Sequence, residues 1–293
     1  MLILLSFGIS TAVAWGLADI FIARSTRQIK PLIAAALVNS IGAMLFVIYY
    51  FAFTDDVVAA NIPAMILTAG AGLLLAAASA LFFIAIGKGP VGIVSAISST
   101  YPAITLLVAL TFFGATISIQ QSIGVAIVLT GVIIATGPFA GPRPRSGYGV
   151  QGPLMALLPA LCWGLGYSML AEAVKLLGWQ AASLVQFATM TVFYGMVVLV
   201  MLQRKGVDAT TLRSGVRNPS VLAAAFTQQG GALLFNIGLG FDNDTGGSVI
   251  VALSACYPVL TMLLAFLYLK ERLPLIAITG GVLAVGGILL LFL

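Results

Sequence analysis

Residues 98–109 read SSTYPAITLLVA and residues 254–265 read SACYPVLTMLLA. The serine, tyrosine, proline, threonine, second leucine and final alanine fall in register, and each copy lies in the middle of a long apolar segment. A proline inside a helix removes a backbone hydrogen bond, which membrane proteins tolerate where neighbouring helices or cavity water satisfy the freed carbonyl. A matched pair of interrupted spans in two halves of a membrane protein indicates a transport site near mid-bilayer. The alternative is that Tyr-Pro only shapes each helix and the tyrosine packs as an interfacial aromatic side chain.

The composition of the whole chain is that of a polytopic membrane protein. Of its 293 residues, 61% are hydrophobic and 7% are charged, and the mean hydropathy is +1.16, whereas a soluble domain carries about 25% charged residues. The net charge of +5 does not indicate nucleic-acid binding, because the basic residues lie in loops between apolar segments. The chain has no histidine, and Cys162 and Cys256 lie inside apolar segments without metal-ligand spacing. We therefore expect no metal, no cofactor and no structural disulfide.

Ten apolar segments of about 20 residues are each long enough to cross the hydrocarbon core of a bilayer. They cover residues 1–22, 31–53, 63–86, 91–113, 118–137, 152–174, 180–202, 218–240, 246–269 and 274–292. The first segment is not a signal peptide, because its AWGL at 14–17 recurs as CWGL at 162–165, deep in the chain. A Pro/Gly-rich stretch within 138–151 separates two groups of five segments. We expect a first repeat at 1–137, a linker at 138–151 and a second repeat at 152–293.

The two groups of five segments match along their length. AAALVN at 34–39 resembles AASLVQ at 181–186, ALFF at 80–83 resembles ALLF at 232–235, and two glycines in the fifth span align with two in the tenth. Because five is an odd number, the second group enters the membrane from the opposite side, so the repeats are inverted. The predicted fold is an all-α membrane protein, with ten transmembrane helices arranged as two inverted five-helix repeats around a central cavity.

The charged residues predict the orientation of the chain in the membrane. All basic residues except Lys175 fall in alternate loops, at 24–30, 87–90, 138–151, 203–217 and 270–273. The acidic loop ends at 55–56 and 242–244 lie on the same side as Lys175. The positive-inside rule places the basic loops in the cytoplasm. Both termini are then expected on the periplasmic side of a bacterial inner membrane.

These features together resemble those of the drug/metabolite transporter superfamily. They are two five-span halves, a Trp-Gly in the first span of each, a Tyr-Pro in the fourth, and a KERLP junction at 270–274 before a glycine-rich last span. The chain is most similar to the EamA-type ten-span branch, which includes exporters of aromatic amino acids. This resemblance implies alternating access by two inverted repeats around a central cavity. One departure is that residues 114–117 read GATI, without the acidic residue that the second half has at Glu271.

A transport cavity needs polar and aromatic side chains that face the axis of the bundle, because polar groups facing lipid are costly. The candidate substrate-binding residues are Trp15, Asn39, Ser79, Phe83, Ser98, Tyr101, Trp163, Tyr167, Gln186, Gln229, Asn236, Ser254 and Tyr257. Their amides and hydroxyls can bind an ammonium or a carboxylate, and their rings can hold an apolar group or a cation. The alternative is that the polar ones only join neighbouring helices. Pro102 and Pro258 are candidate hinges, at which bending would close opposite sides of the membrane.

Two acidic residues inside the predicted spans are interpreted as local ion pairs. Asp19 lies near Arg24 and Glu172 lies near Lys175, close to the ends of their spans. Without a deep carboxylate, obligatory proton coupling is not supported, and facilitated diffusion down a gradient, or coupling through a subtler site, fits better.

The sequence therefore predicts a membrane transporter of small metabolites that acts mainly in export, with amino acids as the expected substrate. We expect the small-molecule substrate and the lipid bilayer as its partners, no nucleic acid, and a monomer, although glycine pairs in the last span could also form a dimer face. A nucleotide-sugar or multidrug carrier remains the alternative within this class, and the spans lack the central Lys or Arg that a sugar phosphate calls for. An intramembrane enzyme or a receptor is the alternative from another class.

Overall fold

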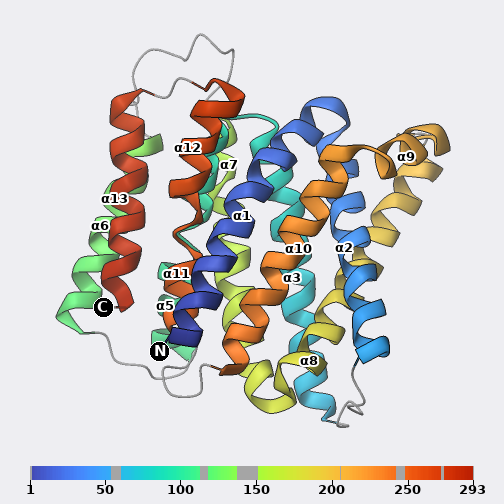
Figure 1. Cartoon of the computed structure of the whole chain (residues 1–293). Helices are drawn as coiled ribbons and strands as arrows, with labels where there is room; N and C mark the ends of the chain where they lie inside the picture. Colours follow the sequence, from blue (N-terminus) through green and yellow to red (C-terminus); the bar gives the residue numbers. More distant parts are fainter. Residues whose placement is uncertain are drawn as a thin grey trace.

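The structure is a computed structural model, and the chain forms a bundle of helices that run roughly side by side (Figure 1). The residues that it describes are 2–53, 61–112, 118–136, 151–204, 206–241, 248–271 and 274–292. Every regular element in these ranges is an α-helix. The helices are α1 (Leu2–Gln28), α2 (Pro31–Phe53), α3 (Ile62–Ile86), α4 (Val91–Ser98), α5 (Tyr101–Phe112), α6 (Ile119–Thr136), α7 (Gln151–Met155), α8 (Leu157–Gln203), α9 (Ala209–Val216), α10 (Pro219–Phe241), α11 (Ser248–Ser254), α12 (Tyr257–Leu269) and α13 (Leu275–Phe292).

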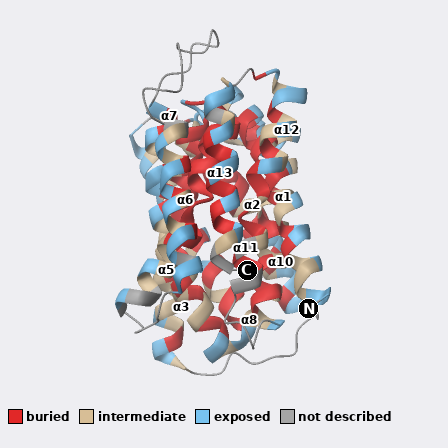
Figure 2. Cartoon of the chain, turned by 90° about the vertical axis from the view of Figure 1, so that its left-hand side faces the viewer, coloured by how far each residue is buried: buried red, intermediate tan, exposed pale blue. Residues whose placement is uncertain are grey.

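The surface of the bundle suits a bilayer. Five described stretches are long and apolar enough to cross a membrane, and shorter apolar helices accompany them. Buried residues run through the height of the bundle, with exposed residues on its outer faces and at its ends (Figure 2). Many of the exposed residues are large and apolar, including Leu73, Phe226 and Phe266. A lipid-facing surface requires such side chains, because the bilayer core offers no partner to a polar group.

The two Tyr-Pro stretches interrupt the fourth and ninth spans, as the sequence predicts. Helix α4 ends at Ser98 and α5 begins at Tyr101, and in the same way α11 ends at Ser254 and α12 begins at Tyr257. Each tyrosine is thus the first residue after a two-residue break. Each proline is the second residue of the new helix, where its missing N–H leaves no helical hydrogen bond unmade.

The two breaks have the same backbone hydrogen bonds. In the first, the N–H of Ser99 donates to Ser95 O at 2.9 Å and the N–H of Thr100 donates to Ile97 O at 3.1 Å. The second repeats this pattern at equivalent positions, from Ala255 to Val251 and from Cys256 to Leu253, at 3.1 and 3.2 Å. Identical local structure in both halves follows from the matched sequence and supports the repeat.

Helix α8 contains both the sixth and the seventh predicted spans. It turns back at Gly178, whose φ of 75° and ψ of 158° fall in a region that glycine adopts without a steric penalty. The arm before Gly178 and the arm after it therefore run in opposite directions (Figure 1). A short helix that the sequence did not predict, α9, lies between α8 and α10. Asp208 caps the start of α9, and its side chain accepts a hydrogen bond from the Thr211 N–H at 2.9 Å.

Equivalent small residues bring equivalent helices together. A Cβ added at Gly16 would lie 2.9 Å from Leu260 Cβ, and one at Gly164 would lie 2.6 Å from Ile104 Cβ. Helix α1 thus packs on α12, and the first arm of α8 packs on α5 in the same way. In the last spans, a Cβ at Gly131 or Gly287 would lie within 2.7 Å of the backbone of the facing helix. Gly131 of α6 and Gly287 of α13 therefore bring these two helices together within the chain.

The half-helices that follow the two breaks lie toward opposite ends of the bundle. Helix α12 is at the end that carries α7 and α9, whereas α5 is at the end near both termini (Figure 1). The fold is therefore ten membrane spans in two inverted five-helix repeats, and the breaks of spans four and nine meet near its centre.

Candidate functional site

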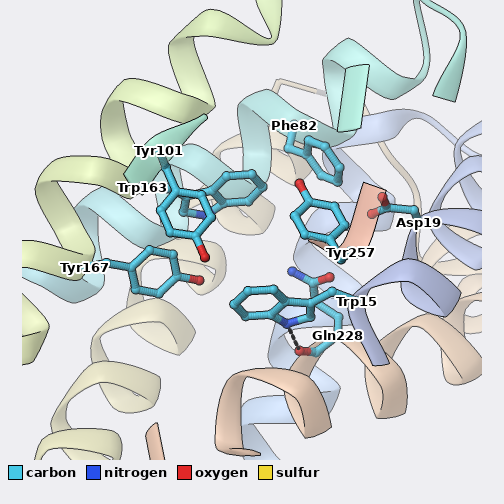
Figure 3. Close-up of a pocket in the computed structure, with 8 residues that line it drawn as sticks. All are labelled: Trp15, Asp19, Phe82, Tyr101, Trp163, Tyr167, Gln228 and Tyr257. Atoms are coloured by element: carbon cyan, nitrogen blue, oxygen red, sulfur yellow. Dashed lines mark hydrogen bonds between the residues drawn. The ribbon is translucent and has the colours of Figure 1, made fainter. Parts of the chain in front are cut away.

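A pocket of about 290 Å³ lies at the centre of the bundle, between the two Tyr-Pro breaks (Figure 3). It is lined by Trp15, Asp19, Phe82, Tyr101, Trp163, Tyr167, Gln228 and Tyr257. These side chains come from both repeats. Six of the eight are aromatic, one is an acid and one is an amide, so the pocket combines an apolar wall with a single ionisable acid.

The aromatic wall is built from pairs that the repeat relates. The ring of Trp15 meets that of Tyr257 edge-on at 6.0 Å, and the ring of Trp163 meets that of Tyr101 edge-on at 6.4 Å. Tyr167 lies between the two pairs, with its ring centre 5.1 Å from that of Tyr101 and 6.2 Å from that of Trp15. Such edge-to-face contacts hold rings in fixed orientations. The wall is therefore pre-formed.

Each tyrosine that follows a break is bonded to the half-helix that precedes the other break. Tyr101 Oη lies 2.9 Å from Ser254 Oγ on α11. Tyr257 Oη donates to Ser95 O on α4 at 3.3 Å. These two bonds cross between the repeats and join the two broken spans directly.

Asp19 is a deep carboxylate, and the prediction that it pairs with Arg24 is wrong. It is 1% exposed, and its Oδ2 accepts hydrogen bonds from Ser95 Oγ at 2.5 Å and from Thr261 Oγ1 at 2.8 Å. No basic side chain in the described part of the chain pairs with it. Residues five apart in a helix point about 140° away from each other, which turns Arg24 outward while Asp19 faces the pocket.

Glu172 behaves as the sequence predicts. Its Oε1 lies 2.6 Å from Lys175 Nζ, and both side chains are half exposed. Residues three apart share one face of a helix, so this pair forms locally where the Asp19 pair does not.

A second pocket of about 300 Å³ adjoins the first and shares four of its lining residues, Trp15, Trp163, Tyr167 and Gln228. Its wall is rich in amides. Gln229 Nε2 donates to Asn39 Oδ1 at 2.7 Å, and Asn39 Nδ2 donates to Ser79 Oγ at 3.0 Å. Gln186 faces this pocket too, and its Oε1 accepts from Asn236 Nδ2 at 2.9 Å. The amides thus form two hydrogen-bonded pairs, Asn39 with Gln229 and Gln186 with Asn236, at a polar extension of the aromatic pocket.

The structure gathers nine of the thirteen candidate residues around these two pockets. They are Trp15, Asn39, Ser79, Tyr101, Trp163, Tyr167, Gln186, Gln229 and Tyr257. Four buried candidates lie behind the wall: Phe83, Ser98, Asn236 and Ser254. Ser98 Oγ donates to Ala156 O at 3.3 Å, away from the pocket. Pro102 and Pro258 are buried at the starts of α5 and α12, and their role as hinges stays a prediction.

Three residues that line the central pocket were missed by the sequence analysis: Asp19, Phe82 and Gln228. Matching of the repeats favoured Phe83, because it aligns with Phe235. The neighbouring Phe82 lines the pocket instead, and its ring centre lies 5.1 Å from that of Trp163. Asp19 carried a usable signal, because it aligns with Tyr167 when the two Trp-Gly motifs are superposed.

A second buried carboxylate joins the same helices nearer the basic end of the bundle. Glu271 Oε1 lies 3.1 Å from Arg27 Nη2, and its Oε2 accepts from the Val91 N–H at 2.9 Å. Burial raises the pKa of the Glu271 carboxyl, and Arg27 and the backbone N–H groups offset this only in part. Glu271 thus connects the end of α12 to α1 and to the start of α4.

No group of three or more cysteine, aspartate or glutamate side chains lies together within the described ranges, so the site built there is one of aromatic, amide and carboxylate groups.

Comparisons with known proteins agree with this architecture. A solved crystal structure superposes with a TM-score of 0.65 over 98% of this chain and 95% of its own, at 17% identity, which shows a shared fold. An uncharacterised protein of Methanocaldococcus jannaschii is 29% identical over 129 residues, which are 43% of this chain and 91% of that protein. That relative is thus about as long as one repeat. The sequence profile of the EamA-like transporter family matches residues 2–137 and again residues 150–293. A match to both halves, on an inverted-repeat bundle with a central pocket, shows that the chain belongs to the EamA-like transporter family of the drug/metabolite transporter superfamily.

Proposed function

We propose that the central pocket is the substrate site of a carrier for small metabolites that bear an amino group, with amino acids as the class expected from the sequence. Export from the cytoplasm of a bacterial cell is the expected direction. Membership of a transporter family gives the general activity, and the central pocket supports this choice of substrate site.

The observation that carries this proposal is the meeting of both broken spans at one pocket. In inverted-repeat carriers the substrate binds at mid-membrane where interrupted helices face each other. Here Tyr101 and Tyr257 line the pocket and also bond to the opposite broken span. A cargo molecule in contact with both tyrosines therefore contacts both sets of moving parts, which alternating access requires.

The pocket argues against a sugar-phosphate cargo, because none of its lining residues is Lys or Arg. Purely facilitative transport is less well supported than the sequence suggested, because that expectation depended on the lack of a deep carboxylate and Asp19 supplies one.

Flux into proteoliposomes tests the proposal. The purified protein should move a labelled amino acid or amine down its gradient, saturably, and empty liposomes should not. Saturable binding without flux would overturn the carrier proposal in favour of a receptor, and conversion of the probe into a product would overturn it in favour of an enzyme.

A matched pair of variants ties the flux to the pocket. Tyr257→Phe removes the hydroxyl that bonds to Ser95 and should lower flux several-fold. Tyr268→Phe makes the same change on the same helix, at a side chain that is 63% exposed on the outer surface, and should leave flux unchanged.

A further inference from the structure

We propose that the central pocket selects an organic cation, a protonated amine or quaternary ammonium with an aromatic or aliphatic body, and that Asp19 is the residue that determines this selectivity. This inference rests on the proposed function, because it takes the pocket as the cargo site. Among molecules that bear an amino or ammonium group, it favours those that lack a carboxylate over amino acids.

The ionisable residues that line the pocket favour a cation. Asp19 is its one ionisable acid, and no Lys or Arg lines either pocket. A carboxylate inside a membrane protein is costly unless it has a partner. Its partners here are two neutral hydroxyls, those of Ser95 and Thr261. A cation in the pocket would supply the missing opposite charge.

The two hydroxyls also orient the carboxylate. Both bind the same oxygen, Oδ2, and Oδ1 makes no hydrogen bond to another described residue. Figure 3 shows the carboxyl group beside the ring of Tyr257, at one end of the pocket. One oxygen is therefore held by α4 and α12, and the other is left for the cargo.

The aromatic side chains point to the same cargo. The polar atoms of three of them are already engaged, because Trp15 Nε1 donates to Gln228 O at 3.2 Å and the hydroxyls of Tyr101 and Tyr257 bind Ser254 and Ser95. These three residues can offer the cargo little except their ring faces. A ring face attracts a cation, and several rings around one carboxylate form the kind of cage that binds ammonium groups.

A zwitterion would meet a less favourable site. The lining groups without a hydrogen bond to another described side chain include the Tyr167 hydroxyl and the Gln228 amide, and Figure 3 shows both directed into the pocket. Both are neutral. The carboxylate of an amino acid would be buried against them without a positive partner, whereas an amine of the same shape has no such group to bury.

The test compares four ligands of one shape: phenethylamine, N,N,N-trimethylphenethylammonium, phenylalanine and 3-phenylpropionate. Binding to the full chain in nanodiscs is measured by tryptophan fluorescence and calorimetry. We expect the two cations to bind at least tenfold more tightly than phenylalanine, and 3-phenylpropionate to show no saturable binding. This comparison needs no variant.

Variants then assign the selectivity to Asp19. Asp19→Asn keeps the shape and removes the charge, so both cations should lose at least tenfold in affinity while neutral 2-phenylethanol is unaffected. Glu172→Gln removes an acid that lies outside the pocket and should change nothing. A variant that binds 2-phenylethanol normally is folded, so loss confined to the charged ligands separates recognition of charge from misfolding.

The inference is overturned if wild type binds phenylalanine or 3-phenylpropionate as tightly as phenethylamine, if neither cation binds saturably, or if Asp19→Asn retains the affinity for both cations. Flux of phenylalanine without a preference for cations would remove this inference and leave the carrier proposal standing. Binding of the cations without flux would overturn the carrier proposal and leave the preference of the pocket for cations standing.

Discussion

At the scale of single residues, the hydroxyls of Tyr101 and Tyr257 are better targets than the whole rings. Replacement of Trp15 or Trp163 by alanine would empty a packed aromatic wall, and such truncations cost about 3–5 kcal/mol of stability. Loss of flux in those variants would then mix stability with function. A tyrosine-to-phenylalanine change removes one hydrogen bond, worth about 0.5–1.5 kcal/mol, and leaves the ring in place.

We therefore predict that Tyr101→Phe lowers flux several-fold while the melting temperature in detergent stays within a few degrees of wild type. The physical reason is that its bond to Ser254 joins the two broken spans. Initial rates in proteoliposomes and thermal melts of the same samples measure both quantities. If melting temperature and flux fell in proportion, the hydroxyl would serve packing alone.

Glu271 gives a prediction with a definite sign in pH. Its pKa in the folded protein is raised above the ordinary value of 4.5, so the folded state holds this proton more tightly than the unfolded state does. Stability contributed at this site is therefore present below pH 4.5 and is lost as pH rises through the raised pKa. Glu271→Gln should flatten that decline.

Melting curves of wild type and Glu271→Gln between pH 4 and pH 8 measure the difference. If wild type instead gained stability relative to the variant as pH rises, the attraction of Arg27 would outweigh the burial.

At the scale of elements, two carboxylates hold the same three helices. Asp19 on α1 accepts from Ser95 on α4 and from Thr261 on α12. Glu271, just beyond α12, contacts Arg27 of α1 and Val91 of α4. The repeat equivalent of Asp19 is Tyr167, and that of Glu271 is Ala115, which lies outside the described residues. Asp19 thus lies at the central pocket and Glu271 nearer the basic end of the bundle, and neither has an acid at its repeat-equivalent position.

Replacement of Pro102 or of Pro258 by alanine should shift the resting state in opposite directions. Alanine at Pro102 or Pro258 restores an N–H at the start of α5 or α12 and lets a helix continue across the break. Because the two half-helices lie toward opposite ends, Pro102→Ala and Pro258→Ala should both slow flux and bias the resting state in opposite directions. Reactivity of cysteines placed near each mouth reports that bias. A shift in the same direction for both variants would make the prolines fixed kinks.

At the scale of the whole molecule, the basic loops set the orientation. We predict that cysteines at Lys88 and Arg213, in a background without Cys162 and Cys256, resist an impermeant thiol reagent added to intact cells. Cysteines at Asp55 and Asp242, both outside the described residues, should react. The reverse pattern would invert the orientation.

The sequence by itself determined the membrane class, the ten spans, the inverted repeat and the positions of the two breaks. These features depend on composition, on segment length and on local rules for proline, all of which act along the chain. Six of the nine candidates that reach the pockets are pairs that the repeat relates, namely Trp15 with Trp163, Asn39 with Gln186 and Tyr101 with Tyr257. A polar or aromatic residue in an apolar span has few roles other than packing or binding, which is how all nine could be found.

Only the tertiary structure decided which face of each helix meets the pocket. Close packing of Gly16 on Leu260 sets the rotation of α1, which brings Asp19 to Thr261 and leaves Arg24 on the surface. The same kind of choice placed Phe82 rather than Phe83 against Trp163. Hydropathy cannot fix such rotations, because a span that is apolar all round has a weak preference for any face, and contacts between helices distant in sequence then select one.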